Sequence, residues 1–233
     1  MRQVVLDTET TGIGAEKGHR IIEIGCVELV DRKLTGRHYH QYVNPQRPSD
    51  EEAVAVHGIT DEFLADKPLF EQVAQSFYDF IDGAELVIHN APFDVGFMDM
   101  EFRRVGMPQT SSFCSILDTL VLARDMHPGQ RNSLDALCRR YGIDNSHREL
   151  HGALLDAEIL SDVYLMMTGG QTDLMFLAGN DDEDISPEET LRRLGQVDGS
   201  SLKVVRATAD EIAAHDGILD ILDKKSDGAI WRR

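Results

Sequence analysis

The chain has 233 residues, 42% of them hydrophobic and 27% charged, which is the composition of a globular protein with a sizeable buried core. This composition excludes collagen-like and wholly disordered chains, and no run of about 20 apolar residues predicts a membrane span. The formal net charge of -18 argues against a free-standing nucleic-acid binder, although an acidic site can meet phosphate through divalent cations.

The first residues show no signal-peptide pattern, so we expect a cytoplasmic protein without a membrane anchor. Cys26, Cys114 and Cys138 lie far apart, and none belongs to a C-x-x-C pair. We therefore expect three small core residues rather than a disulfide or a thiolate metal site.

Runs rich in β-branched and apolar residues predict three strands near the start of the chain, at residues 4–8, 21–30 and 37–43. A glycine-containing turn at 11–14 separates the first two strands, and the three together predict an antiparallel meander. A loop that contains Pro45 and Pro48 follows the third strand.

Helices and strands then alternate. Apolar spacing and turn residues predict, in order, a helix at 70–81, a strand at 86–88, a helix at 95–105, a strand at 113–117, and helices at 134–141 and 153–167. We expect Ser133 to cap the helix that follows it, and the glycines at 169 and 170 to end the last one. This order predicts one α/β domain with a mixed sheet.

The composition changes after Phe176. Six acidic residues lie within the nine positions 181–189, which predicts a solvated linker, placed at 178–201. A strand at 202–207 and an amphipathic helix at 209–223 are expected after it. The segment 202–233 is apolar yet too short to fold alone, so it needs a surface on the first domain or on a partner, and the charged tether favours a partner.

Acidic residues stand at the end of a predicted strand and near the starts of two predicted helices. Asp7 and Glu9 lie two apart at the end of a strand, so both carboxylates point to one face, as ligands of a hard cation would. Taken alone, this pair also fits a solvated strand end, and Asp94 also fits a helix N-cap. Asp156 stands in the first turn of a nearly all-apolar helix, where its burial would be costly without a cation, and His151 precedes that helix.

In order and spacing, the motifs Asp7-x-Glu9, Asn90-x-x-Phe93-Asp94 and His151-x-x-x-x-Asp156 resemble those of the DEDD 3′ to 5′ exonucleases, in the subclass whose third motif carries histidine. Four stretches are further similar to one family, the proofreading (epsilon) subunits of bacterial DNA polymerase III. These stretches are 5–12, 85–91, 131–138 and 150–157, and the similarity reaches residues 211–215 in the tail. The resemblance implies a ribonuclease H-like fold with a five-stranded mixed sheet flanked by helices, and a tethered C-terminal segment.

The resemblance also implies roles for individual residues. His151 would be the general base, and two Mg²⁺ or Mn²⁺ ions would be held by four carboxylates, Asp7, Glu9, Asp94 and Asp156. Asp7, Glu9 and Asp156 would also contact the substrate. Two loop residues would lie at the terminal nucleotide, Glu52 toward the 3′ hydroxyl and His57 against the sugar or base, although an exposed Glu52 also fits a merely solvated residue. Tyr42, Phe93 and Phe97 fit either base-stacking platforms or core aromatics.

The function implied is proofreading: removal of mispaired nucleotides from DNA 3′ ends as 5′-mononucleotides, by a subunit of the replicative polymerase. The alternatives are a free-standing exonuclease acting on RNA or oligonucleotide ends, and a mainly structural polymerase subunit. The nuclease domain would span 1–177, and the polymerase alpha subunit would bind 202–233. A sliding clamp would bind the motif 171–176 through Gln171, Leu174 and Phe176, unless this segment is a helix end that folds back; some relatives also carry a small theta-like subunit.

Overall fold

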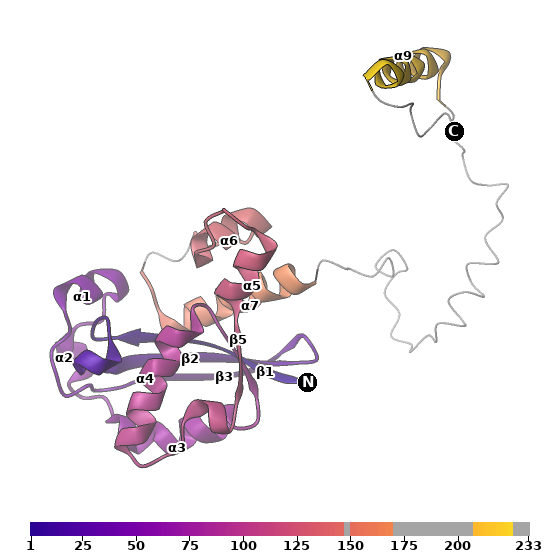
Figure 1. Cartoon of the computed structure of the whole chain (residues 1–233). Helices are drawn as coiled ribbons and strands as arrows, with labels where there is room; N and C mark the ends of the chain where they lie inside the picture. Colours follow the sequence, from indigo (N-terminus) through magenta and orange to yellow (C-terminus); the bar gives the residue numbers. More distant parts are fainter. Residues whose placement is uncertain (147–149, 170–206, 226–233) are drawn as a thin grey trace. The chain divides into compact units, whose positions relative to one another are not determined.

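The computed structural model describes residues 1–146, 150–169 and 207–225, and the chain divides into two compact units, residues 1–176 and 177–233 (Figure 1). The predicted clamp motif at 171–176, the linker at 178–201 and residues 202–206 of the last predicted strand lie outside the described residues. In the described part of the chain, no helix has the length and apolar character needed to cross a membrane.

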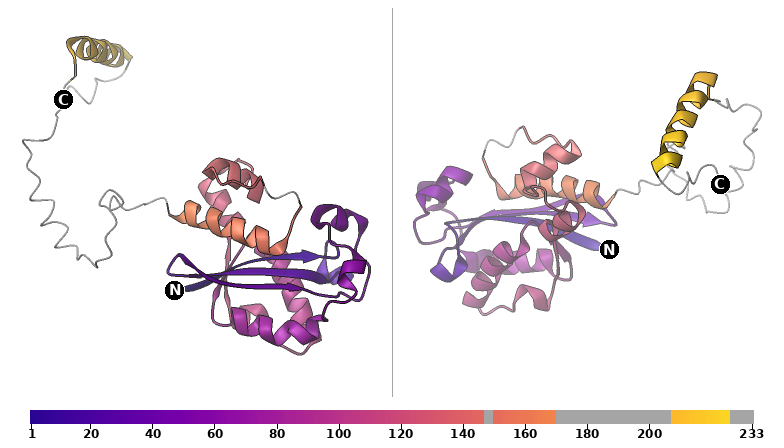
Figure 2. Two further views of the ribbon diagram at one scale, coloured as in Figure 1. Left: turned by 180° about the vertical axis from the view of Figure 1, so that it is seen from behind. Right: turned by 45° about the horizontal axis from the view of Figure 1, so that its top comes forward.

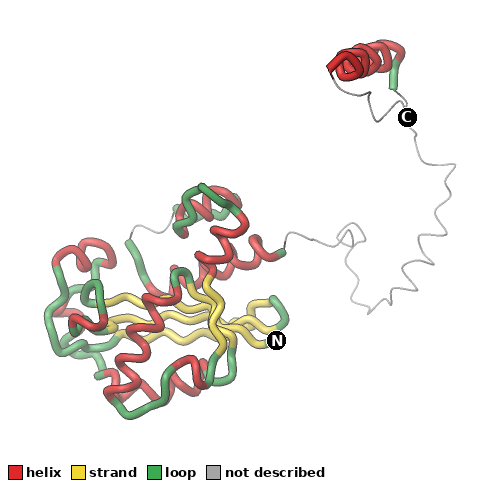
Figure 3. The backbone as a smooth tube through the Cα atoms, in the orientation of Figure 1, coloured by secondary structure: helices red, strands yellow, loops and turns green. Residues whose placement is uncertain are grey.

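A five-stranded mixed sheet forms the centre of the first unit, as predicted (Figure 3). Its strands are β1 (Arg2–Thr10), β2 (Ile21–Val30), β3 (Lys33–Tyr42), β4 (Glu85–Ile88) and β5 (Ser115–Asp118). The order is β3-β2-β1-β4-β5, in which β1, β2 and β3 form the expected antiparallel meander and β4 runs parallel to both β1 and β5.

Helices cover both faces of this sheet (Figure 2). In the first unit they are α1 (Glu51–His57), α2 (Asp61–Leu64), α3 (Phe70–Ile81), α4 (Ala91–Arg104), α5 (Thr119–Met126), α6 (Leu134–Tyr141) and α7 (Ala153–Thr168), with short 3-10 turns η1 (Ala15–Lys17) and η2 (Thr110–Ser112). The second unit contains α9 (Ala209–Lys225), which confirms the helix predicted there.

Three helices were not predicted. The helices α1, α2 and α5 have only 7, 4 and 8 residues, too few for an apolar period to show in the sequence. The segment that carries Glu52 and His57 was expected to be a loop and is instead helix α1, so that expectation was wrong.

Several boundaries also differ from the prediction. Strand β3 begins at Lys33 rather than 37, because its first residues are exposed at the edge of the sheet and lack an apolar pattern. Helix α4 begins at Ala91 rather than 95, after Asn90 in a left-handed conformation. Asp94 therefore lies in the first turn and is not the N-cap.

The alternation of β1 separates two layers of core. Val4 and Leu6 pack with α3 and α4, in a cluster that includes Phe77 and Phe102. Val5 faces the other way and packs with residues of α7. The three cysteines are free and buried, as predicted.

Helix α7 begins directly against β2. A Cβ on Gly25 would lie 2.1 Å from the backbone carbon of Ala153, so only glycine lets the helix come this close. Gly25 is the register partner of Asp7 on β1. The start of α7 is therefore fixed beside the end of β1.

Candidate active site

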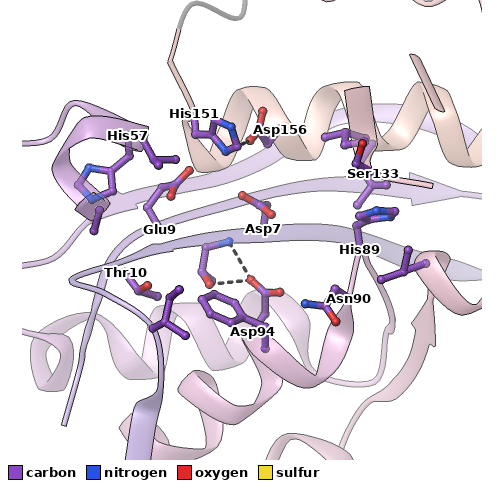
Figure 4. A pocket seen from close by; sticks show the side chains of 18 of the residues that line it. Asp7, Glu9, Thr10, His57, His89, Asn90, Asp94, Ser133, His151 and Asp156 are labelled. Atoms are coloured by element: carbon purple, nitrogen blue, oxygen red, sulfur yellow. Dashed lines mark hydrogen bonds and ion pairs between the residues drawn. The ribbon is translucent and has the colours of Figure 1, made fainter. Parts of the chain in front are cut away.

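A cavity of about 1310 Å³ lies where the last residues of β1, the residues after β4, helix α1 and the start of α7 meet (Figure 4). Its volume is sufficient for a nucleotide. Every residue for which a catalytic, metal or substrate role was predicted lines it: Asp7, Glu9, Glu52, His57, Asp94, His151 and Asp156.

Strand β1 presents two of these acids toward α7. Because side chains alternate along a strand, Asp7 and Glu9 share the face of Val5, which packs on α7. Glu9 is buried, whereas Asp7 is half-buried. Figure 4 shows both carboxylates on the side of His151 and Asp156.

Asp94 reaches β1 from the opposite face of the sheet. It accepts a hydrogen bond from a backbone amide of β1 that has no partner on β4. Strand β4 pairs with β1 only from Gln3 to Val5, so the Thr8 amide lies beyond that ladder. This amide donates to Asp94 Oδ1 at 3.1 Å, and Thr8 Oγ1 donates to the same oxygen at 2.7 Å. Burial raises the pKa of Asp94 to about 7, although the hydrogen bonds from Thr8 oppose the rise.

The start of α7 brings a histidine and an acid to Glu9. As predicted, His151 precedes the helix and Asp156 lies in its first turn. His151 Nδ1 is 3.6 Å from Asp156 Oδ2, and one ligand atom from each of Glu9, His151 and Asp156 lies within 4.8 Å of the others. The His151 side chain is 46% exposed, so water can reach its ring.

Helix α1 closes another side of the cavity. The His151 amide donates to the Val56 carbonyl at 3.1 Å, which ties α1 to the segment before α7. His57 is buried, its Nδ1 accepts from the Ile59 amide at 3.0 Å, and burial lowers the pKa of its ring. Glu52 is exposed on the same helix.

The three candidate aromatics separate into different environments. Phe97 is 2% exposed within the core, so a stacking role for it is wrong. Phe93 lines the cavity and packs on Phe97, with ring centroids 5.0 Å apart. Tyr42 packs edge-on against Phe63, with ring centroids 4.9 Å apart. It also packs on a small cluster of buried apolar residues, Ile22, Ile59 and Leu64.

Several lining residues were not singled out from the sequence. His89 follows β4 directly, and its Nδ1 makes a hydrogen bond with Thr119 Oγ1 at 2.9 Å. Lys17 and Arg124 place positive charge at the lining. The position of His89 at the end of a buried strand was a usable signal, because the ends of parallel strands share one edge of a sheet.

The donors at this site suit a divalent cation. Glu9, Asp94 and Asp156 are each less than a tenth exposed, and buried carboxylates are costly unless a cation or hydrogen bonds compensate. Carboxylate oxygens bind hard ions such as Mg²⁺ and Mn²⁺. The residues present therefore fit a site for divalent metal.

Comparison with known proteins identifies the family. The RNase_T family model, described as an exonuclease, matches residues 4–164. DNA polymerase III subunit epsilon of Escherichia coli is 56% identical over 237 residues, which cover 99% of this chain and 97% of that protein. The same subunit of Rickettsia prowazekii is 44% identical over 227 residues, covering 94% and 96%. The chain belongs to the epsilon subunit family of exonucleases. It is a 3′ to 5′ exonuclease, a phosphodiester hydrolase.

Solved structures agree with this assignment. Exonuclease X in complex with 5′ overhanging duplex DNA has a TM-score of 0.57 and 29% identity, covering 72% of this chain and 92% of that one. Escherichia coli Exonuclease I in complex with a dA16 oligonucleotide has a TM-score of 0.65 at 18% identity, covering 73% and 41%. The second likeness concerns the fold alone. The predicted ribonuclease H-like exonuclease fold is confirmed.

Proposed function

We propose that this epsilon-family protein is the proofreading exonuclease of DNA polymerase III, which removes mispaired nucleotides from DNA 3′ ends as 5′-mononucleotides. The observation that carries the proposal is the convergence of Glu9, His151 and Asp156, with ligand atoms within 4.8 Å, in a cavity that Asp7 and Asp94 also line. A free-standing exonuclease for RNA ends is disfavoured, because the Escherichia coli polymerase subunit matches this chain over 99% of its length.

Four carboxylates would hold two Mg²⁺ or Mn²⁺ ions: Asp7, Glu9, Asp94 and Asp156. When bound, such ions acidify a water molecule and stabilise the leaving 3′ oxygen. His151 is the general base, because histidine is the side chain that most often takes this role and its ring is open to water. Asp156, at 3.6 Å, stabilises the ring once it is protonated.

The terminal nucleotide lies between these acids and helix α1. Asp7, Glu9 and Asp156 face the scissile phosphate, and Glu52 meets the 3′ hydroxyl. The lowered pKa of His57 keeps its ring neutral at neutral pH, so it packs against the sugar or base without added charge.

Other subunits of the polymerase complex bind this chain, and the alpha subunit binds its C-terminal segment. The domains are a nuclease domain at 1–177, a linker at 178–201 and an alpha-subunit-binding segment at 202–233. A nuclease of net charge -18 binds free DNA poorly, and tethering gives it a high effective concentration of frayed 3′ ends. A small theta-like subunit is a further partner, and the complex works in the cytoplasm.

A sliding clamp binds the motif 171–176 through Gln171, Leu174 and Phe176, whose side chains would occupy a groove on the clamp. Replacing Leu174 and Phe176 with Ala is expected to weaken binding to immobilised clamp while single-strand exonuclease activity stays unchanged. Unaltered clamp binding by the double variant would reject the site.

The experiment that tests the proposed function uses a mismatched primer-template, labelled at its 3′ end, with Mg²⁺ or Mn²⁺. The wild type is expected to release a labelled 5′-mononucleotide, and Asp7→Ala to release none. Asp79→Ala, which removes an exposed acid of α3, is the matched control and should retain activity. No mononucleotide from the wild type with either metal, or full activity in Asp7→Ala, would contradict the proposal.

A further inference from the structure

Glu23 is a buried acid next to the active site that does not belong to the four carboxylates of the proposed metal site. It lies on β2 and is 2% exposed. In the register of the sheet it is the partner of Glu9 on β1 and of Tyr42 on β3. Its side chain therefore shares the face of the sheet that carries Glu9 and meets α7.

Each oxygen of the Glu23 carboxylate has a partner. Oε2 accepts from the amide of Ala153 at 3.1 Å, and Oε1 is 2.7 Å from Nε2 of His40. Ala153 is the first residue of α7, where helix amides lack partners within the helix. The N-cap residue Gly152 supplies no side-chain bond, so a carboxylate from β2 performs this role from outside the helix.

The same contact lies close to the catalytic groups. His151 precedes Ala153 by two residues, and Asp156 follows it by three. Gly25, two residues after Glu23, lets the start of α7 rest on the strand. The helix start is thus held against β2 by one close backbone approach and one buried hydrogen bond.

We propose that Glu23 is a positioning residue for the exonuclease reaction: its hydrogen bond to the Ala153 amide holds the start of α7 so that His151 and Asp156 stay beside Glu9. His40 holds the other carboxylate oxygen and so orients Glu23. This role rests on the proposed function, but the contact itself can be tested without activity.

Two conservative variants distinguish the effect of the length of the Glu23 side chain from the effect of its charge. In Glu23→Gln the amide oxygen reaches as far as the carboxylate and still accepts from Ala153, although the charge is gone. In Glu23→Asp the charge remains, but the side chain is one methylene shorter and does not reach the amide. If the hydrogen bond is what matters, Gln retains function and Asp does not; if charge matters, the order is reversed.

The test compares Glu23→Ala, Glu23→Asp and Glu23→Gln in the full chain. Outer residues that orient metal ligands are commonly worth about 10–100-fold in activity or metal affinity. We expect a kcat loss of that size in the Ala and Asp variants, with little change in KM for a single-stranded oligonucleotide, and near wild-type kcat in Glu23→Gln. Mn²⁺ binding, measured by calorimetry, should weaken in the same two variants.

Amide hydrogen exchange is the readout that does not depend on catalysis. The Ala153 amide should exchange faster in the Ala and Asp variants than in the wild type and in Glu23→Gln. If the wild type released no nucleotide, the proposed function would fail while this exchange pattern still reported on the contact.

Glu28→Ala is the matched control. Glu28 is also 2% exposed on β2 and accepts hydrogen bonds from Arg2 and Arg37, but no bond joins it to α7. Its removal is expected to lower the melting temperature without changing kcat or Ala153 exchange. Equal kcat losses in Glu28→Ala and Glu23→Ala, or a Gln variant as impaired as Asp, would overturn the proposal. Should Glu23→Ala fail to fold, the Asp and Gln pair still decides.

Discussion

Asp94 and Asp156 are both 3% exposed, and they reach the cavity from opposite faces of the sheet. Asp94 is held by two hydrogen bonds from Thr8, and its raised pKa shows that burial outweighs them. Asp156 comes from α7 on the other face, and its Oδ2 lies 3.6 Å from His151 Nδ1. A bound cation would compensate the cost of burying both carboxylates.

The raised pKa of Asp94 makes the metal-free protein less stable as pH rises. An acid with a folded pKa of about 7 keeps its proton longer when folded than when unfolded, so stability falls between pH of about 4 and 7. Asp94→Asn keeps an acceptor for the Thr8 amide and carries no charge. Its melting temperature relative to wild type, measured with EDTA, should rise over this pH range, while Mg²⁺-dependent activity is lost.

A melting-temperature difference that is independent of pH would contradict this account of Asp94. Thr8→Val provides the control, because it removes one of the two hydrogen bonds while the carboxylate stays in place. We expect this variant to raise the pKa of Asp94 further, so that its stability keeps falling to a higher pH than that of the wild type.

His151→Ala tests the assignment of the base. Loss of a general base usually costs about 10²–10⁴-fold in turnover, and the carboxylates that bind metal remain in place. Single-turnover assays at neutral pH should show this loss, whereas Asp156→Ala should abolish metal-dependent activity. Wild-type turnover in His151→Ala would exclude it as the base.

Individual residues show what the sequence could and could not predict. Asp156 was identifiable because an acid within an apolar helix is costly, and Asp7 with Glu9 because strand side chains alternate. Glu23 gave the same kind of signal within the apolar run of β2. It could not be interpreted, because its partners lie 17 and 130 residues away in the chain.

At the scale of the elements, segments with a helical period, a cap or an apolar run were predicted, and segments without such a local signal were not. Helix α3 has clear apolar spacing, α6 has a cap in which Ser133 accepts from the Ala136 amide, and α7 is a long, nearly all-apolar run. Helix α1 has neither a long apolar face nor a side-chain cap, and its position depends on contacts such as that between the Val56 carbonyl and the His151 amide. Such a contact joins residues far apart in the chain, so it cannot be predicted from the local sequence.

The close approach of α7 to β2 can be tested with Gly25→Ala. The added Cβ would lie 2.1 Å from the Ala153 backbone, so the start of α7 must move. Overpacking of this kind costs about 1–3 kcal/mol, and kcat should fall as well, because His151 and Asp156 move with the helix. Urea unfolding and steady-state kinetics measure the two effects.

Gly96→Ala in α4 is the matched control, because a Cβ there meets no atom within 4 Å. Alanine is the better helix former by about 1 kcal/mol, so this variant should be slightly more stable and fully active. If Gly25→Ala matched Gly96→Ala in both stability and kcat, the start of α7 would not depend on that contact.

At the scale of the whole molecule, the family and the fold were predictable from three motifs, and the second unit only in part. Helix α9 was found where it was expected, with Ile212 and Ile218 more than half exposed.

Truncation after Gly179 tests whether exonuclease activity and binding to the alpha subunit belong to different parts of the chain. The shortened chain is expected to degrade single-stranded DNA like the full chain and to lose co-purification with the polymerase alpha subunit. Replacing Ile212 and Ile218 with Asp in the full chain should weaken co-purification in the same direction. Retained co-purification of the truncated chain would move the contact onto the nuclease domain.

We infer that four carboxylates around the end of β1, two from that strand and one each from α4 and α7, hold the divalent cations of this 3′ to 5′ exonuclease. Anomalous diffraction from crystals containing Mn²⁺ and a 5′-mononucleotide tests it most directly. We predict two Mn²⁺ peaks bounded by Asp7, Glu9, Asp94 and Asp156, with the nucleotide phosphate between these acids and α1. Crystals in which Mn²⁺ binds elsewhere, while these carboxylates hold none, would contradict the account.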